Sequence, residues 1–322
     1  MIVDLPSTST VEVSKRLVSL REEVGAMALT RVLTLVVVAS EQDVEGAVMT
    51  ALDASRQHPC RVIVVALANR RGRTRLDAQI RVGGDAGASE VLVLRLFGPL
   101  AEHADSVVTP LLLADSPIVV WWPGPAPRSP ATDPVGRMAS RRITDSAATP
   151  GGPMKVLRRL AKGYAPGDTD LAWSRITLWR GLLAAALDEP PYEPVTAVTV
   201  VGGADSPSAE LLAGWLTSRL DAPVHLSLVE DGAGVVEVRL DRASGPVVLS
   251  RPARQKTAVL TQPDQPERRL ALHHRSDAEC LADELRRLDP DEVYAAALGP
   301  GLARVHADLV GSVPATPETD AS

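Results

Sequence analysis

The sequence predicts an α/β (α+β) chain of two domains, each a mixed β-sheet flanked by helices, with an antiparallel meander in the C-terminal one. The length of 322 residues suits two domains. Hydrophobic residues make up 45% and charged residues 23%, as in folded rather than disordered chains. In both halves, β-branched runs alternate with segments of helical period. We therefore expect domains at 1–148 and 149–313, and a disordered tail at 314–322.

The first half predicts a β-α-β core. Ser9 and Glu12 have the spacing of a capping box, so a helix should begin there. Two buried strands flank a helix that Pro59 ends, which predicts a parallel pair with a right-handed crossover. The expected elements are the helix after Ser9, a strand at 30–39, a helix at 43–57, strands at 61–68, 75–82 and 89–97, a helix at 99–114 interrupted by Pro110, and a strand at 117–122. A short ordered element is expected at 141–145.

The second half follows a predicted linker at 147–153, which is rich in glycine and proline. Ser206-Pro207 fits the N-cap and first position of a helix, and Ser276 with Glu279 forms a second capping box. Short strands with short polar loops predict the meander. The expected elements are helices at 154–162 and 171–187, a strand at 195–201, a helix at 207–220, strands at 224–229, 235–240, 247–250, 256–261 and 268–273, and helices at 277–288 and 290–299.

Composition excludes several classes of function. The net charge is −6 and 30 of the 34 basic residues are arginines without a long basic run, so we expect no nucleic-acid partner. The most apolar run, 32–39, is far too short to span a membrane, and the first residues lack the pattern of a signal peptide. The six histidines and two cysteines show no metal-ligand spacing. A cytoplasmic protein without membrane contact, metal or cofactor is expected.

One segment could bind an anion. Gly202, Gly203, Ser206 and Ser208 lie between a predicted strand and a predicted helix, where free N–H groups and the helix dipole favour phosphate. This site would make the chain a sugar-phosphate or nucleotide sensor or enzyme. The alternative is an ordinary capped turn, favoured because Asp205 would repel an anion.

Cys60 is a candidate redox thiol, because His58 and Arg61 beside it would lower the pKa of the thiol. The alternative is a buried cysteine at the start of a core strand, which is the commoner environment of a free cysteine.

Two tryptophan-containing segments are the candidate partner surfaces. Trp121 and Trp122 end a strand and should point to opposite faces, so either both are core or one is an interface anchor. Arg175 and Trp179 are four residues apart on a predicted helix, where a cation–π contact is expected. The alternative is a helix capped by Asp168 or Asp170 with its tryptophans packed on the sheet.

Several long blocks carry a family resemblance: 58–61 (HPCR), 75–100, 110–124 (PLLLADSPIVVWWPG), 141–147 (RRITDSA), 164–188 and 204–216. Together they resemble the glucose-6-phosphate dehydrogenase assembly protein family, OpcA, in its actinobacterial form. The resemblance implies a non-catalytic chain that binds glucose-6-phosphate dehydrogenase, allosterically promotes its active oligomer in the oxidative pentose phosphate pathway, and needs no cofactor. The residues expected to contact this partner or support the contacting surface are Trp121, Trp122, Arg141, Arg142, Asp168, Asp170, Trp173, Arg175, Trp179 and Arg180.

Overall fold

A computed structural model describes residues 1–23, 32–56, 58–82, 90–229, 234–252 and 255–309. The chain forms two compact units, each built from two stretches of sequence. Residues 1–174 and 275–291 form the first unit, and residues 175–274 and 292–322 the second. The predicted division after residue 148 therefore lies inside the first unit, and the predicted tail at 314–322 lies outside the described residues.

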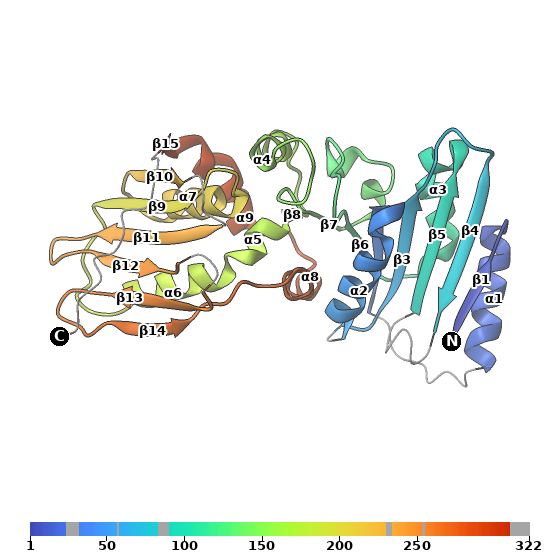
Figure 1. Cartoon of the computed structure of the whole chain (residues 1–322), viewed down its shortest axis with the longest axis horizontal. Coiled ribbons are helices and arrows are strands. Elements are labelled where there is room, and N and C mark those ends of the chain that lie inside the picture. Colours follow the sequence, from blue (N-terminus) through green and yellow to red (C-terminus); the bar gives the residue numbers. More distant parts are fainter. Residues whose placement is uncertain (24–31, 57, 83–89, 230–233, 253–254, 310–322) are drawn as a thin grey trace. The chain divides into compact units, whose positions relative to one another are not determined.

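The first unit contains an eight-stranded mixed sheet in the order β1-β4-β5-β3-β2-β6-β7-β8 (Figure 1). Its strands are β1 (Ile2–Leu5), β2 (Leu33–Ser40), β3 (Cys60–Leu67), β4 (Arg75–Arg81), β5 (Glu90–Phe97), β6 (Ile118–Trp121), β7 (Arg141–Thr144) and β8 (Asp168–Asp170). Its helices are α1 (Thr10–Glu23), α2 (Val44–Ser55), α3 (Ala104–Val108), α4 (Pro153–Lys162), the greater part of α5 (Leu171–Arg175), and α8 (Asp277–Arg286).

Six strands of this sheet, β5-β3-β2-β6-β7-β8, are mutually parallel, and β4 and β1 extend one edge in antiparallel fashion. In chain order these six follow the sequence 3-2-1-4-5-6, the strand order of doubly wound nucleotide-binding sheets. The predicted parallel pair β2–β3 is confirmed, with Leu33 opposite Cys60 and Ser40 opposite Leu67. Ligands in such sheets bind where the strand order reverses, here between β2 and β6.

Both faces of the sheet are covered, which explains why its strands are almost continuously apolar. Helices α2 and α8 cover one face, where Trp121 and Cys280 are buried with them. Helices α1 and α3 cover the other, with Val13, Leu17 and Trp122 in its core. Figure 1 shows α2 on one side of β3 and α3 on the other. Burial on both faces accommodates Trp121 and Trp122 as core residues.

The second unit contains a seven-stranded mixed sheet in the order β14-β13-β12-β11-β9-β10-β15. Its strands are β9 (Ala197–Gly203), β10 (Val224–Val229), β11 (Val235–Asp241), β12 (Val247–Ser250), β13 (Thr257–Thr261), β14 (Arg268–Ala271) and β15 (His306–Leu309). Its helices are α6 (Thr177–Leu187), α7 (Pro207–Arg219) and α9 (Glu292–Ala296), and α9 continues as a π-helical turn at Ala297–Gly301.

The predicted antiparallel meander is present as β11-β12-β13-β14. The expected inclusion of 224–229 is wrong, because β10 pairs parallel with β9. The physical reason is α7, which crosses over between β9 and β10 and so returns the chain in the same direction. Strand β15 extends the parallel edge, and it was not expected from the sequence.

The capping predictions are confirmed. The Ser9 N–H donates to Glu12 Oε2 at 3.0 Å while the Glu12 N–H donates to Ser9 Oγ at 3.3 Å. Ser276 and Glu279 form the same reciprocal pair at 2.7 and 3.2 Å. Ser206 Oγ accepts the Ala209 N–H at 3.2 Å, at the start of α7.

Two long predicted helices are divided in the structure. The segment expected at 99–114 consists of two 3₁₀ turns around the short α3, because Pro110 has no N–H to continue an α-helix. The segment expected at 171–187 is divided at Ile176 into α5 and α6. Within the described residues, no helix combines the length and apolar character needed to cross a bilayer.

Candidate functional site

In a doubly wound sheet, ligands bind at the carboxyl ends of the strands where the strand order reverses, which here is the crevice between β2 and β6. The chain after β2 reads Ser40-Glu41-Gln42-Asp43, with no glycine to let a phosphate approach the backbone. The Ser40 hydroxyl donates to the Asp43 carboxylate, and a Cβ on Gly124 would lie 3.9 Å from Asp43 Oδ2. Carboxylates therefore occupy the position at which dinucleotide-binding proteins hold a pyrophosphate.

The carboxyl ends of β7 and β8 hold a buried polar cluster centred on Asp170, which is completely buried. Its carboxylate accepts hydrogen bonds from Thr144 Oγ1 at 2.8 Å, from Ser146 N and Oγ at 2.9 Å each, and from Ala172 N at 3.0 Å. These bonds join the chain after β7 to the start of α5. Asp170 thus fixes the edge of the sheet, as the predicted alternative of a helix-capping aspartate requires.

The electrostatics of Asp170 oppose its ionisation. Burial, and after it the negative charge of Asp145, raises the pKa of Asp170 to about 6, although its hydrogen bonds lower it. In an unfolded chain the pKa of an aspartate is near 4. The protonated form is therefore favoured by folding, and its contribution to stability is complete below about pH 4 and lost as the pH rises through about 6.

Replacement of Asp170 by asparagine tests this linkage. The variant has no titrating group at position 170, so the difference in unfolding free energy between wild type and Asp170→Asn should decrease by about 2–3 kcal/mol from about pH 4 to pH 7. Chemical denaturation at a series of pH values measures it. Asp221→Asn makes the same replacement at an exposed position and is the matched control. A pH-independent difference for Asp170→Asn would contradict the assignment.

Arg141 and Arg142 lie on β7 and are both buried. Arg141 pairs with Glu284 on α8 and donates to the Asp289 carbonyl at 2.8 Å, while Ser174 Oγ donates to the same Glu284 carboxylate. Arg142 pairs with Asp168 and donates to the Ala139 carbonyl at 2.9 Å. These contacts fasten α8 and the turn before β8 to the sheet.

The predicted site residues of the first unit are therefore all buried rather than gathered on the surface. Trp173 is 1% exposed, and its indole N–H donates to Asp291 Oδ2 at 2.8 Å. Trp121 and Trp122 are 2% and 3% exposed in opposite cores. Burial raises the pKa of Asp168, against the Arg142 hydrogen bond that lowers it.

The remaining residues of the predicted tryptophan–arginine cluster belong to the second unit. Trp179 is 2% exposed, and Arg251, which follows β12 of the meander, places its guanidinium carbon over the ring at 5.3 Å from the centroid. Arg175 and Arg180 are half-buried, and Arg180 donates to Thr177 Oγ1 at 3.2 Å. The unit boundary between 174 and 175 divides the predicted cluster.

Sequence reasoning missed Glu284 and Arg251. Glu284 falls on the buried stripe of α8 formed by Cys280, Leu281 and Leu285. A carboxylate in an apolar stripe signals a buried cationic partner, and this signal was available in the sequence. Arg251 follows a short strand of the meander, and nothing local indicates that it lies over Trp179.

The candidate anion site has the geometry of a capped turn. The Gly203 N–H donates to the Gly234 carbonyl at 2.9 Å, and the Ser206 N–H to the Gly203 carbonyl at 3.0 Å. A Cβ on Gly202 would lie 2.4 Å from the Ala209 Cβ, so glycine is needed there for helix packing. Ser208 lies in the first turn of α7. The backbone donors of this turn serve the fold, and binding of a phosphate here stays a prediction.

Cys60 is completely buried in the core beneath α2 and α8, and Cys280 is buried in the same core. Arg61 is directed elsewhere, because it pairs with Glu90 at 3.3 Å and donates to the Leu111 carbonyl at 2.6 Å. This environment is that of the core cysteine considered as the alternative.

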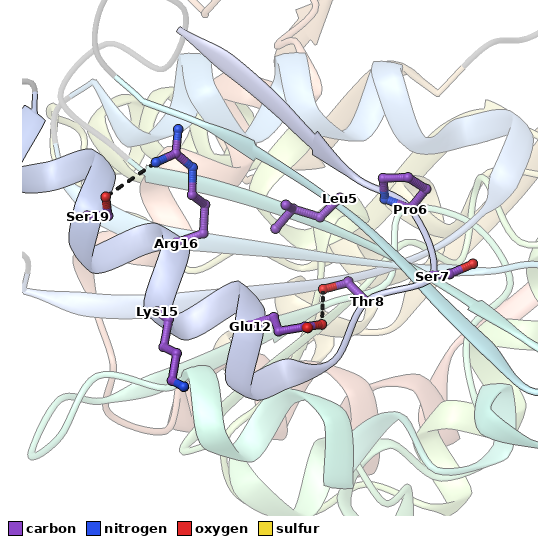
Figure 2. A pocket seen from close by; sticks show the side chains of 8 residues that line it. All are labelled: Leu5, Pro6, Ser7, Thr8, Glu12, Lys15, Arg16 and Ser19. Atoms are coloured by element: carbon purple, nitrogen blue, oxygen red, sulfur yellow. Dashed lines mark hydrogen bonds between the residues drawn. The ribbon is translucent and has the colours of Figure 1, made fainter.

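A pocket of about 540 Å³ lies between the end of β1 and helix α1. Figure 2 shows its lining: Leu5, Pro6, Ser7, Thr8, Glu12, Lys15, Arg16 and Ser19. Thr8 Oγ1 donates to Glu12 at 3.0 Å, and this bond, followed by those from Ser9, lowers the pKa of Glu12. Arg16 donates to Ser19 Oγ at 3.3 Å. The polar groups of the pocket thus stabilise α1, and in the described ranges no acidic, histidine or cysteine side chains gather as a metal site would require.

The fold and these sites define a doubly wound α/β protein with a second mixed sheet, in which buried polar clusters support the edge of the first sheet. Two family models match: the N-terminal domain of a glucose-6-phosphate dehydrogenase subunit (OpcA assembly domain) at residues 51–162, and the C-terminal domain of that subunit at 166–298. The chain belongs to this family of OpcA glucose-6-phosphate dehydrogenase assembly subunits.

Other comparisons give weaker likenesses. No curated protein matches the sequence. An OtsA apo structure is 10% identical with a TM-score of 0.28, over 62% of this chain and 66% of that one. A structure described as trehalose-6-phosphate from E. coli bound with UDP-2-fluoro glucose is 11% identical with a TM-score of 0.25, over 61% of this chain and 64% of that one. The chain thus spans slightly less than two thirds of both. A structure of glucose-6-phosphate dehydrogenase in complex with its substrate glucose-6-phosphate is 9% identical with a TM-score of 0.35, over 91% of this chain and 97% of that one. TM-scores this low establish no shared fold.

Proposed function

We propose that the chain is a non-catalytic, cytoplasmic assembly factor that binds glucose-6-phosphate dehydrogenase and allosterically promotes its active oligomer. The observation that carries the proposal is the match of both halves, 51–162 and 166–298, to domains described as parts of a subunit of that dehydrogenase. The pentose phosphate pathway is then the metabolic setting, because the dehydrogenase opens its oxidative branch.

The crevice of the first sheet supports the non-catalytic part of the proposal. A dinucleotide needs a glycine-rich turn and a helix N-terminus that attract its pyrophosphate. Here Glu41 and Asp43 precede α2, and Glu45 lies in its first turn. Glu41 and Glu45 pair with Arg95 and Arg81, and Asp43 places a carboxylate at the start of α2 where a pyrophosphate would have to bind. The doubly wound sheet is therefore better suited to a structural role.

Activation without chemistry requires differential binding. The chain must bind the active assembly more tightly than the inactive form of the dehydrogenase. A difference of about 1–3 kcal/mol would shift activity roughly 5- to 150-fold. We propose that the buried tryptophans and the Arg141 and Arg142 clusters support the contacting surface, and that the half-buried Arg175 and Arg180 are better placed for direct contact.

Mixing the purified chain with its cognate dehydrogenase tests the proposal. We expect light scattering to show a complex larger than either component. We also expect faster NADPH formation at dehydrogenase concentrations too low for complete assembly. The chain alone, incubated with glucose-6-phosphate and NADP, should produce no NADPH. Absence of a complex together with unchanged kinetics of the dehydrogenase would overturn the proposed function.

A further inference from the structure

Helix α4, Pro153–Lys162, has a concentration of positive charge that is unusual in this acidic chain. Its ten residues include four cations and no carboxylate. By contrast, α1 carries three bases and three acids, and α8 four acids and one base. Among the described helices of ten residues or more, α4 alone carries more than one cation without an acid.

The charges of α4 are sorted by face. Val156, Leu157 and Leu160 are buried. Lys155, Arg158 and Lys162 are exposed. Their spacing of three, four and seven residues places them along one face of an α-helix. The helix is therefore anchored on one side and presents a row of three cations on the other.

The fourth cation of the helix is used internally. Arg159 is half-buried, and its guanidinium donates to the Ala126 carbonyl at 3.3 Å. The structure gives neither Lys155 nor Lys162 an ion pair with a carboxylate of the described residues.

The loop before α4 carries one more exposed cation close to the end of the helix. A Cβ on Gly163 would lie 3.6 Å from Ser129 and 3.7 Å from the Arg128 carbonyl oxygen, so the preceding loop contacts the end of α4. Arg128 on this loop is exposed. We define the basic face as Lys155, Arg158, Lys162 and Arg128.

We propose that the basic face is a docking surface for an acidic patch on the dehydrogenase, where carboxylates pair with its ammonium and guanidinium groups. The inference rests on the proposed function, because it assigns the partner of that function to a surface. Complementary charges at an interface speed encounter and fix orientation, and a face of one sign is suited to both.

A folded acidic protein fits this face better than a long polyanion. The chain as a whole has a charge of −6, so a nucleic acid or an anionic membrane extending past the basic face would approach a protein of net negative charge. A local patch of carboxylates can pair with Lys155, Lys162 and Arg128 without approaching the rest of the chain.

Charge reversal tests the inference. Lys155→Glu/Arg158→Glu/Lys162→Glu should weaken binding of the dehydrogenase on the order of tenfold or more, measured by titration calorimetry. Wild-type affinity should fall when salt is raised from about 50 to 300 mM, and the variant should lose most of this dependence. A neutral set, Lys155→Gln/Arg158→Gln/Lys162→Gln, should give an intermediate loss and guards against misfolding of the reversed variant. Circular dichroism and the melting temperature check that both triple variants are folded.

The matched control is Arg70→Glu/Arg71→Glu/Arg73→Glu, which makes the same charge change on the exposed loop between β3 and β4. This control should bind the dehydrogenase within about threefold of wild type. Equal binding by wild type and the α4 variants, or equal loss in the control, overturns the inference and leaves the proposed function intact. Absence of wild-type binding overturns both. Wild-type binding to a DNA duplex or to phosphatidylserine vesicles that the α4 variants lose also overturns the docking assignment.

Discussion

Replacing Arg141 with methionine is expected to lower the free energy of unfolding by about 3–5 kcal/mol, because it leaves the Glu284 carboxylate buried without its cation. Glu284 would keep only the Ser174 hydroxyl as a partner among the bonds described above. The side chains of Arg141 and Glu284 are 3% and 6% exposed, so little solvent is available to compensate. Helix α8 lies far along the chain from the strands it covers. If it detached after loss of the Arg141–Glu284 pair, the buried apolar residues around Leu281 would also be exposed.

Two further variants separate this effect from the loss of any ion pair. The double replacement Arg141→Met/Glu284→Gln should recover most of the loss, because no unpaired charge remains buried. Arg239→Met removes an exposed pair with Asp241, whose side chains are 45% and 35% exposed, and should cost less than about 1 kcal/mol. Urea denaturation measures all three. A single variant no less stable than the double one would contradict the account.

Replacing Gly301 with alanine is expected to cost about 2–3 kcal/mol, through overpacking of the second unit. A Cβ there would lie 2.2 Å from the Gly214 carbonyl oxygen and 2.9 Å from the Ala296 carbonyl oxygen. In the converse direction, a Cβ on Gly214 would lie 2.5 Å from the Ala297 carbonyl oxygen. All these atoms belong to backbone, so the crossing of α7 and the π-helical turn must open to admit a methyl group.

The neighbouring Gly299 provides the control in the same turn. A Cβ on Gly299 meets nothing within 4 Å, so Gly299→Ala should be neutral or slightly stabilising. Thermal unfolding followed by circular dichroism compares the two variants. Equal melting temperatures for Gly301→Ala and Gly299→Ala would show that the close approach of the two backbones does not limit packing.

Local patterns in the sequence predicted much of the fold. The capping boxes at Ser9 and Ser276 act within four residues, so their sequence signal is complete. The same holds for the β-branched strands β2 and β3 and for the helix capped by Ser206. Strand β8 was missed because it has only three residues, Asp168–Asp170, and its order comes from pairing with β7 rather than from propensity.

Partners distant in the chain limited prediction of the site. Arg141 and Glu284 are separated by 143 positions, and Trp179 lies beneath an arginine of the meander. The sequence singled out Arg141, Asp170 and Trp173 as candidates, but it left open whether they are buried or exposed. The exposure of these side chains depends on which elements cover them. Helix α8 packs on the first unit through contacts between distant parts of the chain, which no local sequence pattern indicates.

Buried tryptophans and an exposed basic helix have different roles in this account of the first unit. The buried polar clusters hold the sheet edge in one arrangement, and we propose that the surface built on that arrangement contacts the partner. Substitutions at Arg141 or Asp170 should then affect binding only as far as they affect folding. Substitutions on α4 should affect binding at unchanged stability.

The most direct measurement of the central claim is the oligomeric state of the dehydrogenase across a dilution series, with and without the chain, by sedimentation velocity. If the chain binds the active assembly more tightly, the midpoint of assembly should move to lower enzyme concentration by roughly 5- to 150-fold, with activity following the assembled fraction. An unchanged midpoint, at chain concentrations that saturate binding, would contradict the account.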